Sequence, residues 1–170
     1  MEKSETLTKL ANLIQGIPIA MMTTVDAEGY IHSRPMANQE GDLKNTFDGT
    51  LWFLTGGDSG KVHELKINHQ VNLVYSEPKS NSYISISGEC QTIDNRTKAR
   101  ELWNPIYKAW FPKGMEDPNL KVLKVTVHKA EYWASHSSTA VQVFGYIKAL
   151  ATGKPSHGEL SDHDKINLAG

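Results

Sequence analysis

A glycine-rich turn followed by a lysine is the part of this sequence best suited to bind a ligand. Residues 51–54 form an apolar run that ends at Thr55 and a glycine pair, and an amphipathic run starts near Asp58. This pattern predicts a strand, a tight turn and a helix. Gly56 and Gly57 allow the backbone amides of the turn to face inward. The free N–H groups of the first helical turn point at the same spot, where an anion would bind. The segment therefore predicts an anion-binding site.

Lys61 strengthens this prediction, because it would lie in the first turn of the helix, at the positive end of the helix dipole. A cation in that position costs roughly 0.3 kcal/mol or more unless an anion such as phosphate is bound. Asp58 offers an alternative to a bound anion, because its carboxylate would offset the positive charge of Lys61 from within the chain. A nucleotide-binding P-loop is excluded, because only three residues separate Gly56 from Gly60 and no hydroxyl side chain follows the lysine.

Few other side chains form a recognisable site. Cys90 is the single cysteine, so it cannot form an internal disulfide, and we interpret it as a strand residue rather than a reactive thiol. His157 and His163 are too weak a signal to predict a metal site. His32 would share a strand face with Arg34 and is a candidate acid or base, although a structural role is more common for such a histidine.

The composition is that of one globular domain without a general affinity for nucleic acid or membranes. Among 170 residues there are 18 basic and 19 acidic side chains, a net charge of −1, and 39% of residues are hydrophobic. No run approaches the roughly 18 apolar residues of a membrane helix, and the first segment does not resemble a secretory signal. We therefore expect a cytoplasmic protein with a single domain over residues 1–155 and a polar, mobile tail over residues 156–170.

The apolar periodicity predicts a mainly β chain with flanking helices. Strands are expected over residues 17–25, 30–38, 51–55, 69–76, 83–93 and 120–133, and helices over residues 4–15, 58–67, 95–103, 106–111 and 137–150. The helix after the glycine turn should bury Val62, Leu65 and Ile67. Short connections indicate an antiparallel barrel. Pro35 lacks an N–H group, so its strand should be an edge strand or be bulged.

An aromatic cluster separates the last two predicted strands. Its members are Trp103, Tyr107, Trp110 and Phe111. Such a cluster usually belongs to a hydrophobic core. A lid over a flat ligand is the alternative, because aromatic side chains stack well on ring systems. The sequence leaves both interpretations open.

Several short motifs, in their order and spacing, resemble the FMN-binding split barrels of the pyridoxamine 5'-phosphate oxidase-like superfamily, most closely its general stress protein branch. The motifs lie between residues 14 and 150 and are Arg34-Pro35-Met36, Leu51-Trp52-Phe53-Leu54-Thr55, Ser59-Gly60-Lys61, Ser85-Ile86-Ser87-Gly88, Ala109-Trp110-Phe111-Pro112 with Asp117-Pro118, and Glu131-Tyr132-Trp133. The resemblance implies an antiparallel six-stranded split β-barrel that binds FMN.

The resemblance also implies which residues contact FMN. Arg34, Ser59 and Lys61 would hold the phosphate, with Pro35 and Gly60 in the same two segments. The isoalloxazine would lie along Phe53, Leu54 and Thr55, with Met36 beside them. Such proteins bind flavin at the interface of a homodimer, so the partner would contribute a further set of residues: Tyr83, Ser85, Ser87, Trp110 and Trp133.

The sequence departs from the vitamin oxidases of this superfamily. Thr139 and Val141 stand where those enzymes carry an arginine and a histidine, and Tyr83 stands where they carry a glutamine, which argues against pyridoxamine 5'-phosphate oxidase activity. We expect an FMN-binding homodimer of stress or redox physiology. It would be either an FMN-dependent oxidoreductase acting on a small molecule or a non-catalytic flavin carrier or sensor. A relative that uses deazaflavin or haem is a further alternative, which the compact phosphate cradle disfavours.

Overall fold

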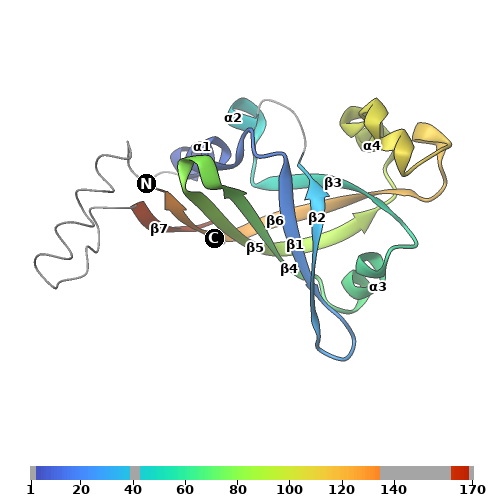
Figure 1. Ribbon diagram of the computed structural model, residues 1–170, viewed down its shortest axis with the longest axis horizontal. Helices are drawn as coiled ribbons and strands as arrows, with labels where there is room; N and C mark the ends of the chain where they lie inside the picture. Colours follow the sequence, from blue (N-terminus) through green and yellow to red (C-terminus); the bar gives the residue numbers. More distant parts are fainter. Residues whose placement is uncertain (1–2, 39–42, 135–161, 169–170) are drawn as a thin grey trace, which may run out of the picture.

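The described strands form one strongly curved antiparallel sheet (Figure 1). This computed structural model describes residues 3–38, 43–134 and 162–168. The strand order is β2-β1-β4-β5-β6-β3, and β7 pairs with β6. The strands are β1 Ile19–Val25, β2 Ile31–Ala37, β3 Thr50–Gly56, β4 Gln70–Glu77, β5 Ser82–Ile93, β6 Leu120–Ala134 and β7 Asp162–Asn167. Strands β1 to β6 confirm the predicted six-stranded antiparallel split barrel, and β7 is an additional strand on β6.

Short helices lie at the ends and outer side of this sheet (Figure 1). They are α1 Lys3–Ile14, α2 Leu43–Thr46, α3 Gly60–Ile67 and α4 Arg96–Leu102, with the 3-10 turns η1 Pro78–Ser80, η2 Pro105–Ala109 and η3 Gly114–Glu116. α2 lies in a segment for which the sequence predicted neither a strand nor a helix. The helix predicted over residues 137–150 lies outside the described residues, as do Thr139, Val141 and His157.

β1 and β2, which match the strands predicted over residues 17–25 and 30–38, form a hairpin. Asp26 closes the turn, because its Oδ1 accepts hydrogen bonds from the backbone N–H groups of Glu28 and Tyr30. Gly29 has a φ of 90°, which glycine adopts without strain. Within the described part of the chain, β2 pairs only with β1, so the edge position inferred from Pro35 is confirmed.

The main core fills the inside of the curved sheet. The inward-facing side chains come from alternate strand positions, and those of Met22, Phe53, Leu73, Ile84, Ile86 and Val125 are fully buried. A second, smaller cluster lies on the other side of β3 and β6, where Ala99 and Phe111 pack on Val122. α4 and the segment that carries the aromatic cluster, residues 103–111, are therefore attached to the outside of the barrel.

β6 is the strand that joins the two halves of the sheet. Its first part pairs with β3 from Leu120 to Thr126, and its last part pairs with β7 from Lys129 to Ala134. Along its other edge it pairs with β5, and the register shifts by a bulge between Ser87 and Gly88. The two strands approach closely here, since a Cβ on Gly88 would lie 2.2 Å from the Thr126 carbonyl oxygen.

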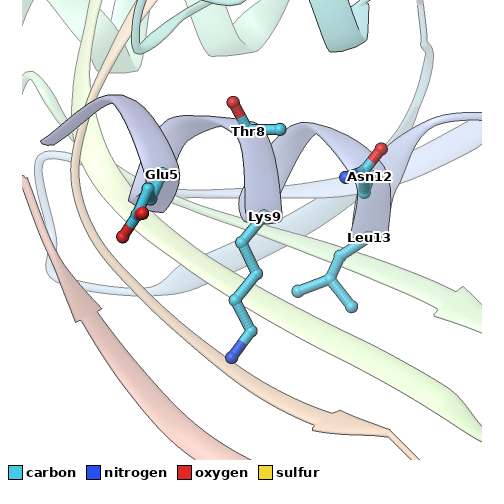
Figure 2. Close-up of a pocket in the computed structure, with 5 residues that line it drawn as sticks. All are labelled: Glu5, Thr8, Lys9, Asn12 and Leu13. Carbon is cyan, nitrogen blue, oxygen red and sulfur yellow. The ribbon is translucent and has the colours of Figure 1, made fainter. Parts of the chain in front are cut away.

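α1 closes one end of the barrel through an apolar face. Leu10 and Ile14 are fully buried against the main core. On its other side the helix borders a hollow lined by Glu5, Thr8, Lys9, Asn12 and Leu13, and Figure 2 shows the Lys9 side chain extending from the helix past the neighbouring strands. The Lys9 ammonium lies 4.7 Å from the centre of the Tyr132 ring, a cation–π contact that joins α1 to β6.

Three details differ from or refine the sequence predictions. Ile67 is 65% exposed, so only Val62 and Leu65 form the buried face of α3. The segment Asp162–Asn167 is a strand rather than part of a featureless tail, and its Ile166 is buried in the main core. Cys90 is a buried strand residue as predicted, and burial raises the pKa of its thiol to about 12.

Among the helices of the described residues, none is both long and apolar enough to span a membrane.

Candidate functional site

A groove of about 610 Å³ lies between β2, the β3–α3 turn and the aromatic segment. Ile19, Pro35 and Met36 line it from β1 and β2, and Tyr107, Trp110 and Phe111 line it from the aromatic cluster. The remaining lining residues come from β3, the turn that follows it, α3 and the start of β6: Leu54, Thr55, Gly56, Asp58, Lys61 and Asn119, with Ala37 from β2. The groove thus combines apolar and aromatic walls with a polar end.

The β3–α3 turn forms the polar end of the groove and is held in place by Asn119. The backbone N–H of Gly57 donates to the Asn119 carbonyl at 2.7 Å. The backbone N–H of Asp58 donates to the Asn119 side-chain oxygen, Oδ1, at 3.1 Å. Asn119 Nδ2 in turn donates to Asp58 Oδ1 at 2.8 Å. Of the glycine pair that was expected to turn its amides towards an anion, Gly57 therefore has its N–H occupied within the chain. Nothing local in the sequence marked Asn119 for this role.

The glycine pair is explained by close packing rather than by an unusual backbone conformation. A Cβ on Gly56 would lie 3.0 Å from Asn119 Nδ2, and one on Gly57 would lie 3.1 Å from the Lys121 side chain. Neither glycine is among the residues with positive φ. The turn is thus compact because the start of β6 packs directly on it.

α3 begins beside the groove as predicted, with Ser59 as the N-cap residue. The Ser59 side chain makes no capping hydrogen bond, and its Oγ lies 3.3 Å from the Oγ1 of Thr55. The N–H groups of Gly60 and Lys61 belong to the first helical turn, where they have no intrahelical partner. The hydroxyl pair and these N–H groups lie next to one another at the same helix end.

Lys61 is a half-buried cation that lines the groove. Among the residues that the structure describes, no carboxylate lies within ion-pair distance of its ammonium. Burial lowers the pKa of Lys61 below the usual lysine value of 10.5, and the charge of Arg34 lowers it further, while Glu64 and Asp58 act in the opposite direction. A desolvated cation without an ion-pair partner favours the arrival of an anion.

Arg34 lies close to Lys61 but is not among the residues that line the groove. Its Nη1 donates to Glu64 Oε2 at 2.9 Å and to Thr24 Oγ1 at 2.6 Å, and its Nη2 donates to Glu64 Oε1 at 3.1 Å. Thr24 Oγ1 also donates to Glu64 Oε2. The hydrogen bond from Arg34 holds the pKa of the Glu64 carboxyl below its usual value. Arg34, which the resemblance assigned to the phosphate, is thus tied to Thr24 and Glu64, two residues that the sequence did not single out.

The remaining residues that the resemblance assigned to the flavin divide into two groups. Pro35, Met36, Leu54 and Thr55 line the groove together with Lys61. The Phe53 side chain is fully buried in the main core, so it cannot contact a ligand in the groove. Phe53 occupies an inward-facing position of β3, and its neighbours Leu54 and Thr55 are the residues of this strand segment that line the groove.

Trp110 lines the groove of its own chain, although the resemblance assigned it to a partner subunit. Its side chain is 67% exposed, and its ring centre lies 6.5 Å from that of Tyr107. Phe111 is instead buried, with its ring centre 6.5 Å from that of Trp103. The aromatic cluster thus includes a packed part, as expected for core residues, and an exposed part that lines the groove.

The other residues assigned to a partner subunit lie on the exposed face of the sheet, away from the groove lining. Tyr83 on β5 faces Trp133 on β6 in the strand register, and both are partly exposed. Ser85 and Ser87 lie on the same side of β5, where Asn72 Nδ2 donates to Ser85 Oγ at 2.9 Å.

His32, the histidine on β2, contacts a residue of the hairpin turn rather than the groove. His32 Nε2 lies 2.8 Å from Asp26 Oδ2 at the hairpin turn, and His32 is not among the groove residues. The hydrogen bond with His32 lowers the pKa of the Asp26 carboxyl. Within the described ranges no group of three or more His, Cys, Asp or Glu side chains is arranged to hold a metal ion.

Comparisons with known proteins agree with this architecture. The family profile described as "Pyridoxamine 5'-phosphate oxidase like" matches residues 5–157. The chain is 30% identical over 161 residues to Protein bli-3 of Neurospora crassa, an alignment that covers 88% of this chain and 75% of that protein. A solved structure assigned to general stress protein 26 of Jannaschia sp. CCS1 superposes with a TM-score of 0.72 at 18% identity, covering 98% of this chain and 100% of that one.

A second solved structure is more similar in sequence. The general stress FMN/FAD binding protein of Xanthomonas citri is 29% identical, with a TM-score of 0.64, over 79% of this chain and 92% of its own. The family profile covers most of the chain, and the strand order is that of the barrel described above. This chain therefore belongs to the pyridoxamine 5'-phosphate oxidase-like family, and its structural relatives include the general stress proteins of that family.

Proposed function

We propose that the protein binds FMN in the groove, with the phosphate at Lys61 and the ring system between the walls formed by β2 and Trp110. The Xanthomonas citri relative is described as binding FMN or FAD, which makes a flavin the first ligand class to consider. The groove volume of about 610 Å³ falls within the range of ordinary cofactor sites. Its aromatic and apolar walls suit a flat ring system.

Lys61 is the observation that carries this proposal. Its ammonium is half-buried at the polar end of the groove without an ion-pair partner among the described residues. A phosphate at this point would also meet the Thr55 and Ser59 hydroxyls and the first N–H groups of α3. Charge-assisted hydrogen bonds to phosphate are the stronger ones, so Lys61 should dominate this end of the site.

The residues of the groove would bind and orient the flavin rather than react themselves. Bound FMN supplies hydride-transfer chemistry at its ring N5. The titratable side chains that line the groove are Asp58, Lys61 and Tyr107, and His32 on β2 is engaged with Asp26. Trp110 and Pro35 would limit the access of water to the ring from two sides. We propose a flavin-dependent oxidoreductase of small molecules on this basis.

A non-catalytic flavin carrier or sensor is the second candidate. It is favoured by the lack of a histidine among the groove residues that the structure describes, because no general acid or base of near-neutral pKa is then positioned at the ring. Steady oxidation of NADH or NADPH by the FMN-loaded protein would exclude the carrier. Tight FMN binding without any such turnover would exclude the reductase.

The direct experiment is a titration of purified, flavin-free protein with FMN, followed by flavin fluorescence. Binding with a dissociation constant in the micromolar range or below supports the proposal. Riboflavin, which has the same ring system but no phosphate, should bind more weakly by about tenfold or more, because it cannot use the charge of Lys61. A protein that leaves FMN fluorescence unchanged at high concentration would contradict the proposal.

Alkaline pH is expected to weaken FMN binding through Lys61. Burial and the charge of Arg34 lower the pKa of Lys61 in the empty site below the ordinary lysine value of 10.5. Its ammonium therefore loses its proton at a lower pH than that of an exposed lysine. Phosphate stabilises the protonated form, so affinity is full below the pKa of the empty site and falls as the pH rises through it. The FMN-to-riboflavin affinity ratio measured from pH 7 to 10.5 should therefore decrease. The Lys61→Arg variant, which stays charged, should keep a constant ratio.

We also propose that a second copy of this chain covers the exposed face of the sheet. Met21 and Val74 face one another on β1 and β4, and Tyr83 and Trp133 do so on β5 and β6. All four are exposed large hydrophobic residues, and so is Ile19, which also lines the groove. The apolar face is thus continuous with the proposed flavin site, which supports a dimer whose partner lies beside the flavin.

A charged substitution on this face is expected to dissociate the dimer. Val74→Glu would place a carboxylate, and its symmetry copy, in an apolar interface, which costs several kcal/mol unless the subunits separate. Analytical ultracentrifugation should show a dimer for the wild type and a monomer for the variant. Ile67→Glu is the matched control, because Ile67 is 65% exposed on α3 and should leave the dimer intact. A wild type that sediments as a monomer at high micromolar concentration would refute the proposed interface.

A further inference from the structure

A second pocket, of about 520 Å³, borders α3 and the turn before it. It is lined by residues of this turn and helix, of the end of β5 and of the start of β6, together with the residue before β4. None of these residues lines the groove. The proposed flavin site therefore does not account for this second cavity, which we call the α3–β5 pocket.

The polar lining of the α3–β5 pocket is basic. Lys66 and Lys121 contribute two ammonium groups, and no aspartate or glutamate is among the lining residues that the structure describes. Thr92 on β5 adds a hydroxyl to the same lining. A lysine in the last turn of a helix is favourable in itself, so Lys66 alone would not indicate a site. The second lysine, which comes from β6, makes the pocket a candidate for binding an anion.

Asp94, which follows β5, only partly offsets this positive charge. Its Oδ2 accepts a hydrogen bond from Lys121 Nζ at 2.5 Å, and its Oδ1 lies 3.7 Å from Arg96 Nε. One carboxylate is thus shared by two cations. The hydrogen bond from Lys121 lowers the pKa of the Asp94 carboxyl, so it is ionised at neutral pH. Together Lys66, Lys121 and Arg96 outnumber this carboxylate three to one.

The rest of the lining provides an apolar surface beside a fixed cation. Val62 and Leu65 of α3 are only 4% and 2% exposed, and Ile93 of β5 is half-buried. The stem of Lys121 packs on the turn, because a Cβ on Gly57 would lie 3.1 Å from its Cγ and 3.4 Å from its Cε. This packing and the bond to Asp94 hold the Lys121 ammonium in place. Small-molecule sites commonly combine such an apolar lining with a few fixed polar groups.

We propose that the α3–β5 pocket binds a small organic anion. Its carboxylate or phosphate group would contact Lys66 and Lys121, and its apolar body would pack on Val62, Leu65 and Ile93. Charge-assisted hydrogen bonds from the two lysines would supply the specificity for an anion. The proposal does not rest on the proposed flavin site, because the two cavities have no lining residue in common.

The test is a titration of the full-length, flavin-free protein with phenyl phosphate and, separately, with benzoate, followed by the backbone amide shifts of ¹⁵N-labelled protein. It is carried out in the Lys61→Met variant, so that an anion bound in the groove does not obscure the result. We expect saturable shifts at the amides of Lys66 and Thr92, with a dissociation constant below about 1 mM for at least one of the two anions. The ligand that binds more tightly identifies the preferred anionic group. Failure of both anions to shift these amides would overturn the proposal.

Two further ligands separate the contributions of charge and apolar body. Benzyl alcohol carries the same ring without a charge, so it should bind at least about tenfold more weakly than the better anion. Inorganic phosphate lacks the ring and should bind several-fold more weakly than phenyl phosphate, because it buries no apolar surface. Binding of benzyl alcohol as tight as that of the anions would overturn the proposed role of the lysines. Equal binding of inorganic phosphate and phenyl phosphate would overturn the proposed role of the apolar lining.

Variants of the pocket itself complete the test in the same background. Adding Lys66→Met should weaken binding of the better anion by about tenfold. Adding Thr92→Glu should abolish it, because a carboxylate at this exposed position of the lining repels the ligand and competes for the lysines. Lys79→Met is the matched control, since this lysine of η1 lines neither cavity and its loss should leave binding unchanged.

Thermal melting of each variant checks that it is folded. Unchanged affinity in the Lys66→Met variant, or retained binding in the Thr92→Glu variant, would overturn the proposal. No flavin enters these titrations. A wild type that binds neither FMN nor riboflavin would refute the proposed function and leave this result standing, so the two failures are distinguishable.

Discussion

Lys61→Met is expected to weaken FMN binding by about ten- to a hundredfold, or roughly 1.4–2.7 kcal/mol, while riboflavin binding changes little. The ammonium is half-buried at the polar end of the groove and has no ion-pair partner among the residues described here. Methionine keeps the length and apolar volume of the lysine stem, so the groove walls should stay in place. Titration by flavin fluorescence at moderate salt measures both ligands in the same protein.

Two controls define what this result would mean. Lys61→Arg retains the positive charge and should keep most of the FMN affinity, although its geometry differs. Lys66→Met removes a lysine from the last turn of the same helix, away from the groove, and should leave both affinities near the wild-type values. An equal loss of FMN and riboflavin in Lys61→Met would show that the side chain supports the groove structurally and does not bind phosphate.

Gly88→Ala is expected to lower the free energy of unfolding by about 2–4 kcal/mol, the upper range for overpacking at a close backbone contact. The new Cβ would lie 2.2 Å from the Thr126 carbonyl oxygen and 3.3 Å from the Val127 Cα. Both neighbours are backbone atoms, so no side chain can move aside to relieve the clash. β5 and β6 would have to separate at the bulge, where their pairing register shifts between Ser87 and Gly88.

Urea unfolding of the flavin-free protein measures this loss directly, and it should appear as a lower midpoint with an unchanged slope. Gly60→Ala is the matched control in the same measurement. A Cβ there would meet only the Glu64 carboxylate, at 3.6 Å, which is an ordinary contact in the first turn of α3. Its effect should be within about 1 kcal/mol, since alanine is favoured over glycine in helices. Equal effects of the two variants would refute the steric account of Gly88.

Local patterns in the sequence predicted much of the fold, because each rests on a local physical cause. Alternating apolar residues mark β5 and β6, whose inward side chains form the core. The missing N–H of Pro35 placed β2 at an edge of the sheet, and the side chain of Asn95 caps α4 by accepting from the Lys98 N–H. β7 was missed because its sequence is polar apart from Ile166, and it is a strand only because β6 offers a free edge.

The candidate site was predicted less completely, because its contacts join residues far apart in the chain. Lys61 was recognised from its place at a helix start, which is a local signal. The ties that arrange the site are not local: Asn119 contacts Asp58 across 61 residues, and Arg34 contacts Glu64 across 30. The sequence could not show that β2 supplies the arginine that pairs with Glu64 on α3.

The pairing of β6 with three other strands affects how the protein unfolds. The same strand pairs with β3 beside the groove, with β5 along most of its length, and with β7 at its far end. Fraying of this strand would release several neighbours at once, including the start of β6 that packs on the turn before α3. Loss of the binding groove and melting of the barrel should therefore be one cooperative event, so a bound cofactor would protect the whole molecule against heat and proteolysis, not only the region it touches.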